Sequence, residues 1–183
     1  MINETFFRTA LFIYGIFCIL ICIYFLRTGT DNIRKREQLC RKVYPGTLIT
    51  LISLLYCVPL AEPIAPDFLA GMLYPIAVVL TIICHKFADY HFSRAVSGFT
   101  ILVTLTFITN LWTYSMPESH LITKLFAAFT YILAVAAITI SAKPYLLRDW
   151  FRKLAVCTKM KYSTTTFFAV YALLCFIIGT LYA

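Results

Sequence analysis

The sequence predicts an all-α, polytopic integral membrane protein, folded as a single bundle of six transmembrane helices. Three observations favour this class. Of the 183 residues, 61% are hydrophobic and only 13% are charged, whereas about a quarter of the residues of a soluble domain are charged. The apolar residues gather in six long runs, and the connectors between the runs alternate in charge. Lipid is the solvent that suits such runs, because a helix satisfies its own backbone hydrogen bonds there.

Each apolar run is close to the roughly 20 residues that a helix needs to cross the hydrocarbon core. The predicted spans are residues 9–26, 43–61, 68–84, 95–114, 121–142 and 164–183. The first run is followed by Arg27 rather than by a small-residue cleavage site, which favours an uncleaved span over a signal peptide. Since no Gly/Ser-rich linker divides the chain, we expect residues 1–183 to form one domain.

Basic residues set the predicted orientation of the bundle. The first, third and fifth connectors hold 14 of the 16 Lys and Arg residues, whereas the second and fourth hold acids and no base. Because cytoplasmic loops carry the excess of Lys and Arg, these three connectors are predicted to be cytoplasmic and both termini to face outward. A cytoplasmic membrane of the bacterial type suits a protein of this size.

The fifth connector predicts an amphipathic helix that lies in the membrane plane between the last two spans. Its apolar residues follow the i, i+3, i+4, i+7 spacing and its bases lie on another face. Part of this positive charge is expected in any cytoplasmic connector, whether or not the connector binds a ligand. The basic surface is also a candidate for binding phosphate or anionic lipid at the cytoplasmic face, with acidic proteins as an alternative partner. The predicted binding residues are Arg94, Arg148, Arg152 and Lys153.

A polar cluster interrupts the apolar sequence at the third connector, in IICHKFADYHFSRAVSG, residues 82–98. If the helix continues through the connector, His85 and Asp89 share a face, where a carboxylate can orient an imidazole. With His91 they are the candidate catalytic residues of an enzyme acting on lipid headgroups. The alternative is a solvated turn between two spans, and the absence of a zinc-ligand spacing favours this second interpretation.

The sequence lacks the motifs of several other kinds of catalytic and cofactor site. The acids are never closer than five residues apart, which argues against a Mg²⁺ site for lipid diphosphates. Nucleotide-binding glycine motifs and the nucleophile elbow are absent, and the three His residues are badly placed for a membrane haem. We therefore expect no metal, no cofactor and no nucleic-acid partner, and an enzyme is the less favoured class.

Polar and helix-breaking residues inside the spans suggest a cavity. Pro75 falls inside the third span and is expected to kink it. On the fourth span, Thr106, Thr109 and Asn110 share a face that can line a path for a small solute. The alternative is that these residues hydrogen-bond between helices. The candidate cavity residues are Pro75, Thr106 and Asn110.

Small residues form a stripe along the fifth span, at alternating spacings of three and four. Small side chains let helix backbones approach closely in lipid, either inside one bundle or between subunits. The stripe therefore predicts a packing face for another helix of this chain, for a second copy or for a membrane-protein partner. Its members are Ala127, Thr130, Ala134, Ala137 and Ser141.

Three functional hypotheses follow from these patterns. The first is a non-catalytic accessory or scaffold subunit that acts through helix and lipid contacts, and it is favoured by the missing catalytic motifs. The second is a channel or carrier for a small solute. The third is an enzyme for lipid headgroups at the cytoplasmic face. Membrane lipids are expected partners in all three.

Overall fold

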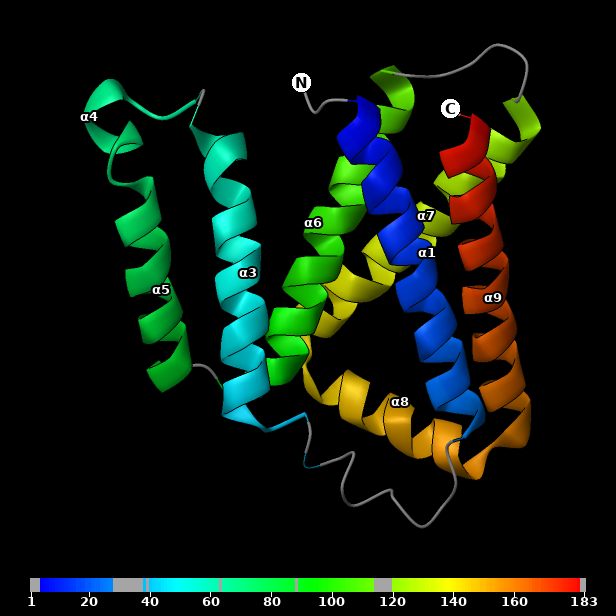
Figure 1. The fold of residues 1–183 in the computed structure, drawn as a ribbon. Helices are drawn as coiled ribbons and strands as arrows, with labels where there is room; N and C mark the ends of the chain where they lie inside the picture. The colour runs from blue at the N-terminus through cyan, green and yellow to red at the C-terminus, as the bar shows by residue number, and fades with distance from the viewer. Residues whose placement is uncertain are drawn as a thin grey trace. The chain divides into compact units, whose positions relative to one another are not determined.

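A computed structural model describes residues 4–27, 38, 40–62, 64–87, 89–113 and 120–181. Over these ranges the chain forms eight α-helices and no strand, which confirms the predicted all-α class (Figure 1). The helices are α1 (Glu4–Leu26), α3 (Val43–Ala61), α4 (Asp67–Ala70), α5 (Leu73–Phe87), α6 (His91–Thr113), α7 (His120–Ala142), α8 (Tyr145–Val156) and α9 (Thr158–Leu181).

Five of these helices are long and apolar enough to cross a membrane, judged by length and composition. They indicate a membrane protein. The qualifying segments are Phe7–Leu26, Val43–Ala61, His91–Leu111, Leu121–Ala142 and Thr158–Leu181. Most of the first connector, including residues 28–37, and residues 115–119 of the fourth lie outside the described ranges, so the charges predicted there are not located.

The third predicted span differs from the expectation. Residues 68–84 are divided between α4 and the 15-residue α5, with a turn at Gly71 and Met72. At 1.5 Å per residue α5 is about 22 Å long, shorter than a hydrocarbon core of about 30 Å. Pro75 is the third residue of α5, where a missing N–H is tolerated. The interruption is thus a helix break just before Pro75 rather than a kink in mid-span.

Helices α8 and α9 cover the fifth connector and the last span. Leu147 and Leu154 of α8 are buried while Arg152 and Lys153 are exposed, so this helix has the amphipathic character that its sequence predicts. A single residue, Cys157, separates α8 from α9. Helix α9 begins well before the predicted start at residue 164, because charge ends an apolar run without ending a helix.

The chain divides into two compact units, which we describe separately. The first unit comprises Met1–Ile33, Val103–Val135 and Trp150–Ala183. The second comprises Arg34–Leu102 and Ala136–Asp149. Helices α6, α7 and α8 therefore contribute residues to both units.

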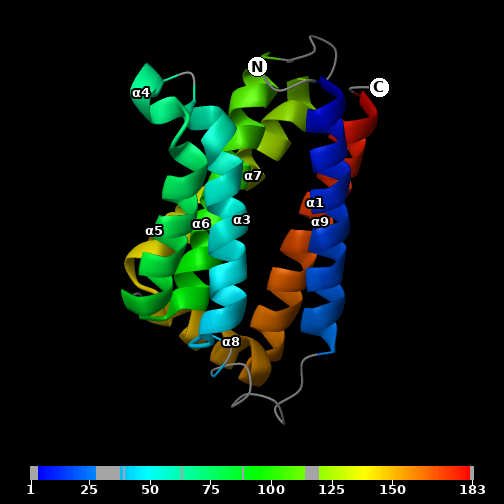
Figure 2. The ribbon, with the colours of Figure 1, turned by 60° about the vertical axis from the view of Figure 1, so that its left-hand side comes forward.

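In the first unit, α1 and α9 run side by side along their lengths (Figures 1 and 2). Glycines permit the close approach of aromatic rings. A Cβ atom added to Gly15 would lie 3.1 Å from the Phe176 ring, and one added to Gly179 would lie 3.2 Å from the Phe12 ring. Each ring thus fills the space that a side chain at the facing position would need.

Aromatic rings also fill the centre of the first unit. The Tyr171 ring stacks on Phe126, with 5.5 Å between ring centroids, and meets the Tyr14 ring edge-on at 5.9 Å. The Tyr171 hydroxyl lies 3.0 Å from the Thr130 hydroxyl, so the polar end of the ring is satisfied by α7. Offset or edge-on ring pairs are favourable by about 1 kcal/mol each beyond their burial.

The small-residue stripe lies on the buried side of α7. Thr130 and Ala137 are buried, and the three other members are half-buried. Large apolar side chains occupy the exposed side of the same helix: Leu125, Tyr131, Ile132, Val135 and Ile138. This division favours packing of the stripe inside the protein over packing against a second subunit.

In the second unit, α3 packs against α5. The buried residues of these two helices are small or medium in size, among them Ser53 and Val58 on α3 and Ala77 and Thr81 on α5. The hydroxyls of Ser53 and Thr81 donate to carbonyls of their own helices. The interface therefore depends on close backbone approach, which is how helices associate in lipid.

We predict that Thr130→Val destabilises the protein by about 1 kcal/mol, because hydrogen bonds between helices in lipid contribute roughly 0.6 to 1.7 kcal/mol. Unfolding by SDS in mixed micelles measures the change. Thr166→Val, at an exposed position of α9, is the matched control and should be neutral. Equal effects of the two substitutions would show that the bond to Tyr171 contributes nothing.

Candidate functional site

The polar cluster of the third connector lies where three helix ends of the second unit meet. Helix α5 ends at Phe87, and α6 begins at His91. Both ends adjoin the first two turns of α3: Thr47 contacts His85, and Gly46 contacts His91. We call this region the helix-end cluster, and define it as Thr47, His85, Tyr90, His91 and Ser93.

His85 connects the end of α5 to α3. Its Nδ1 atom lies 2.7 Å from the Thr47 hydroxyl, which also donates to the carbonyl of Val43 at 3.0 Å. Because a hydroxyl has one hydrogen, the Thr47 oxygen accepts from His85, and we assign the proton of the His85 ring to Nδ1. The Tyr44 ring lies beside the imidazole, with 6.1 Å between centroids. His85 is therefore held in one orientation.

Gly46 brings α3 against the first turn of α6. A Cβ atom added to Gly46 would lie 2.6 Å from Cδ2 of His91, 2.7 Å from the backbone nitrogen of Phe92 and 2.9 Å from the carbonyl carbon of His91. Two of these three atoms belong to the backbone, which cannot yield as the end of a flexible side chain can. A glycine is thus required at this point for the two helices to touch.

Two buried polar atoms of the cluster have no hydrogen-bond partner. They are Nε2 of His91, whose residue is 2% exposed, and Oγ of Ser93, whose residue is 0% exposed. Most buried polar groups in proteins are paired, and an unpaired one costs about 1 to 3 kcal/mol. Two such atoms within one helical turn are a feature that the packing alone does not explain.

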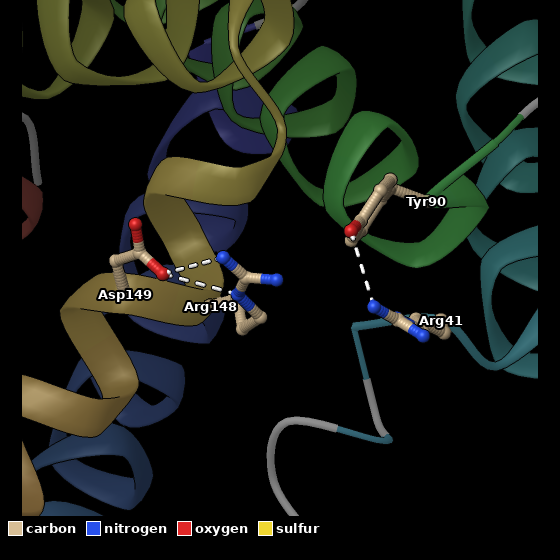
Figure 3. A network of polar contacts seen from close by, with 4 residues as sticks. All are labelled: Arg41, Tyr90, Arg148 and Asp149. Atoms are coloured by element: carbon tan, nitrogen blue, oxygen red, sulfur yellow. Dashed lines mark hydrogen bonds and ion pairs between the residues drawn. The ribbon is translucent and has the colours of Figure 1, made fainter.

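The turn between α5 and α6 has a left-handed residue. Tyr90 has a φ angle of 52°, a conformation that is uncommon for residues other than glycine. Arg41 stabilises it from the segment before α3: its guanidinium donates to the Tyr90 hydroxyl at 3.4 Å and lies 5.4 Å from the ring centroid (Figure 3). The turn is thus restrained by a side chain that is distant in sequence.

The predicted arrangement of His85 and Asp89 on one continued helix is absent, because α5 ends at Phe87. Asp89 is exposed in the turn, and His85 bonds to Thr47 instead. His91 is buried two residues further on. No group of three His, Cys, Asp or Glu side chains suitable for a metal ion occurs in the part of the chain that the structure describes.

The predicted phosphate-binding or lipid-binding residues fall in both units. In the second unit, Arg94 is exposed, and Arg148 forms an ion pair with Asp149 at 2.9 Å (Figure 3). Arg152 and Lys153 belong to the first unit and are exposed on α8. Arg148 thus has an acidic partner that the sequence analysis did not assign to it.

The predicted cavity residues also belong to different units. Pro75 is exposed in the second unit. Thr106 and Asn110 are buried in the first unit, where the Asn110 amide donates to the Thr106 carbonyl at 2.7 Å. The amide hydrogen bond that we expected between helices lies within α6.

Sequence reasoning overlooked Gly46, Thr47 and Ser93. A signal for Gly46 was present, since the Pro45-Gly46 pair opens an apolar run where most residues are large. Neither Thr47 nor Ser93 has a comparable signal, because hydroxyl residues are common near helix starts.

The long apolar helices indicate an α-helical membrane protein, and the helix-end cluster is a polar junction in its second unit. The chain matches no protein-family model, no curated protein and no solved structure.

We predict that Gly46→Ala destabilises the protein by about 2 kcal/mol, because overpacking against unyielding backbone costs roughly 1 to 3 kcal/mol. Gly98→Ala on α6 is the matched control, since a Cβ atom there meets nothing within 4 Å. The thermal unfolding midpoint in detergent should fall for the first variant and stay or rise for the second. Equal midpoints would contradict the contact between α3 and α6.

Proposed function

We propose that the protein is a six-span membrane protein that acts as a non-catalytic accessory or scaffold subunit, through contacts with a partner helix and with lipid. The short helix α5 would complete the six spans. The orientation proposed here has both termini outside and the basic connectors in the cytoplasm of a bacterial-type cell. The single observation that carries the accessory role is the exposed surface of α5.

Helix α5 exposes apolar side chains on most of its circumference. Ala77 and Thr81 are its buried residues. The exposed large side chains are Tyr74, Ile76, Val78, Val79, Leu80, Ile82, Ile83 and Phe87. A helix covered so little by its own chain has room for a neighbouring helix on several sides.

The length of α5 gives a reason for a protein neighbour rather than lipid alone. A helix of about 22 Å in a core of about 30 Å forces the bilayer to thin, and this mismatch favours helix association. A partner subunit or a second copy that packs along α5 would replace the lipid around it and so reduce the area of bilayer that must thin. Such a contact supports an accessory role and requires no chemistry from this chain.

Basic residues of the first unit support the lipid part of the proposal. Lys153 of α8 and Lys159 of α9 are exposed, and Arg27 is exposed after the end of α1. A base near an anionic membrane surface contributes about 1 kcal/mol of attraction. In the proposed orientation these bases face the headgroups of the cytoplasmic leaflet.

The two other hypotheses have less support. A carrier needs polar residues that converge, yet Pro75 is exposed and the Asn110 amide bonds within its own helix. A lipid-headgroup enzyme needs an activated base, yet His85 is engaged by Thr47 and Asp89 follows the end of α5. We therefore retain the accessory role as the proposal.

We predict that the protein purified in mild detergent carries a protein partner or forms a defined oligomer, together with anionic lipid. Ile82→Trp on α5 should abolish that association because the added bulk blocks the exposed face. The matched control is Ile132→Trp on α7, since the two isoleucines are 54% and 55% exposed. Size-exclusion chromatography with mass spectrometry measures both. A lipid-free monomer in the wild-type preparation would overturn the accessory role.

We predict that Cys157, which is exposed between α8 and α9, is labelled from the cytoplasmic side. In a chain that retains Cys157 alone, a membrane-impermeant maleimide should react in inverted vesicles and not in intact cells. A chain whose single cysteine comes from Ile64→Cys, in the second connector, should react in the opposite way. Labelling of both positions from one side would contradict the six-span orientation.

A further inference from the structure

We propose that the second unit binds a phosphate group at the junction of the first turns of α3 and α6, with His91 and Ser93 as hydrogen-bond donors. This inference does not depend on the accessory role proposed above. It rests on three independent features of this region: the polarity of the helix ends, the unpartnered polar atoms and the charges beside them.

Two helix N-termini meet at this junction. Gly46, in the first turn of α3, contacts His91 and Phe92, the first two residues of α6. The N-cap of α3, Lys42, provides no side-chain cap hydrogen bond. Each N-terminus presents backbone N–H groups and roughly half a positive charge, whereas the single C-terminus of α5 offsets only one of the two. The junction therefore attracts an anion and repels a metal cation.

The unpartnered polar atoms lie at the same junction. The Cδ2 atom of His91 is covalently bonded to Nε2, and Cδ2 is the ring atom nearest to the position of a Cβ atom on Gly46. The edge of the ring that carries Nε2 is thus turned toward the first turn of α3. Nε2 itself has no hydrogen-bond partner although His91 is 2% exposed.

Ser93 departs from the behaviour of the next hydroxyl residues along α6. Ser97 donates to the carbonyl of Arg94 at 3.0 Å, and Thr100 donates to the carbonyl of Val96 at 2.8 Å. A buried hydroxyl in a helix commonly bonds back in this way. The Ser93 hydroxyl is fully buried in the first turn of α6, where no earlier turn of the helix lies behind it, and it has no partner, so its hydrogen is available to a ligand.

Charged side chains adjoin both first turns. Arg41 and Lys42 precede α3, Arg94 lies in the first turn of α6, and all three are exposed. Asp89 is the exposed acid of the turn and opposes an anion. The set of donors consists of imidazole, hydroxyl and helix N-terminal N–H groups, which suits the several acceptor oxygens of a phosphate.

Two sources supply this chemistry: inorganic phosphate and the phosphate of an anionic lipid headgroup. Both present the same oxygens to the donors. Only the lipid has acyl chains, and these would pack against the exposed apolar surface of the second unit. The experiment below separates them.

The test measures the thermal unfolding midpoint of the full chain in an uncharged detergent. Inorganic phosphate is compared with chloride at equal ionic strength, and phosphatidic acid is compared with phosphatidylcholine in the same micelles. We expect phosphate or phosphatidic acid to raise the midpoint, since a ligand that binds the folded state stabilises it. If only phosphatidic acid raises the midpoint, the ligand is the lipid headgroup. If inorganic phosphate raises the midpoint, with or without an effect of the lipid, the phosphate group alone is sufficient for binding.

Ser93→Ala and His91→Phe should each weaken the apparent affinity about tenfold or more, as loss of a buried charge-assisted hydrogen bond does. His91→Phe removes the unpartnered nitrogen but adds bulk beside Gly46, so the response of each variant is measured against its own midpoint without ligand, and Ser93→Ala, which removes one oxygen atom, is the decisive variant. Ser97→Ala is the matched control one turn further along α6 and should bind normally. Asp89→Asn should strengthen binding.

The proposal is overturned if neither probe raises the wild-type midpoint above its reference. It is also overturned if Ser93→Ala and His91→Phe respond as the wild type does, because the anion would then bind to exposed bases. Failure to find a partner subunit in the purification experiment bears on the accessory role alone. The two proposals can therefore fail separately.

Discussion

Helices in hydrocarbon gain nothing by expelling water from between them, and this constraint governs the whole chain. Their association depends on close packing and on hydrogen bonds between helices. In the first unit, Gly15 and Gly179 each meet an aromatic ring, and Thr130 bonds to Tyr171. In the second unit, Gly46 meets the backbone of α6, and Thr47 bonds to His85. Both units thus combine a glycine contact with a hydroxyl bridge, although their side chains differ greatly in size.

The same constraint determines what the hydroxyl groups can do. Thr9, Ser53, Thr81 and Thr165 each donate to a carbonyl one turn back in their own helix. Thr47 and Thr130 also donate in this way, and each makes one further bond to another helix. A hydroxyl that is satisfied by its own helix presents little polarity to a solute. Polar residues in mid-span therefore support helix packing more than a transport path.

The ends of the helices were predictable from the sequence only where a change in composition marks them. The apolar run of residues 43–61 corresponds to α3 at both ends, because Lys42 and Glu62 flank it with charge. The break before α5 was missed, since a run of apolar residues gives no sign that Gly71 and Met72 form a turn. The early start of α9 was missed because Lys159 and Lys161 end the apolar run but are good helix formers.

The candidate site was predictable in its location but not in its contacts. The unusual density of polar residues at 82–98 did mark the junction of helix ends, since polar groups concentrate where helices leave the apolar core. Its partners, Gly46 and Thr47, lie about 40 residues earlier, and only the packing of α3 against α5 and α6 brings them close. The left-handed Tyr90 belongs to the same junction. Strained and unpaired groups persist where surrounding contacts hold them in place, and here those contacts are the glycine, the hydroxyl bridge and Arg41. Unpaired polar groups at this junction lower the stability of the free protein, and a ligand that pairs them would recover that loss.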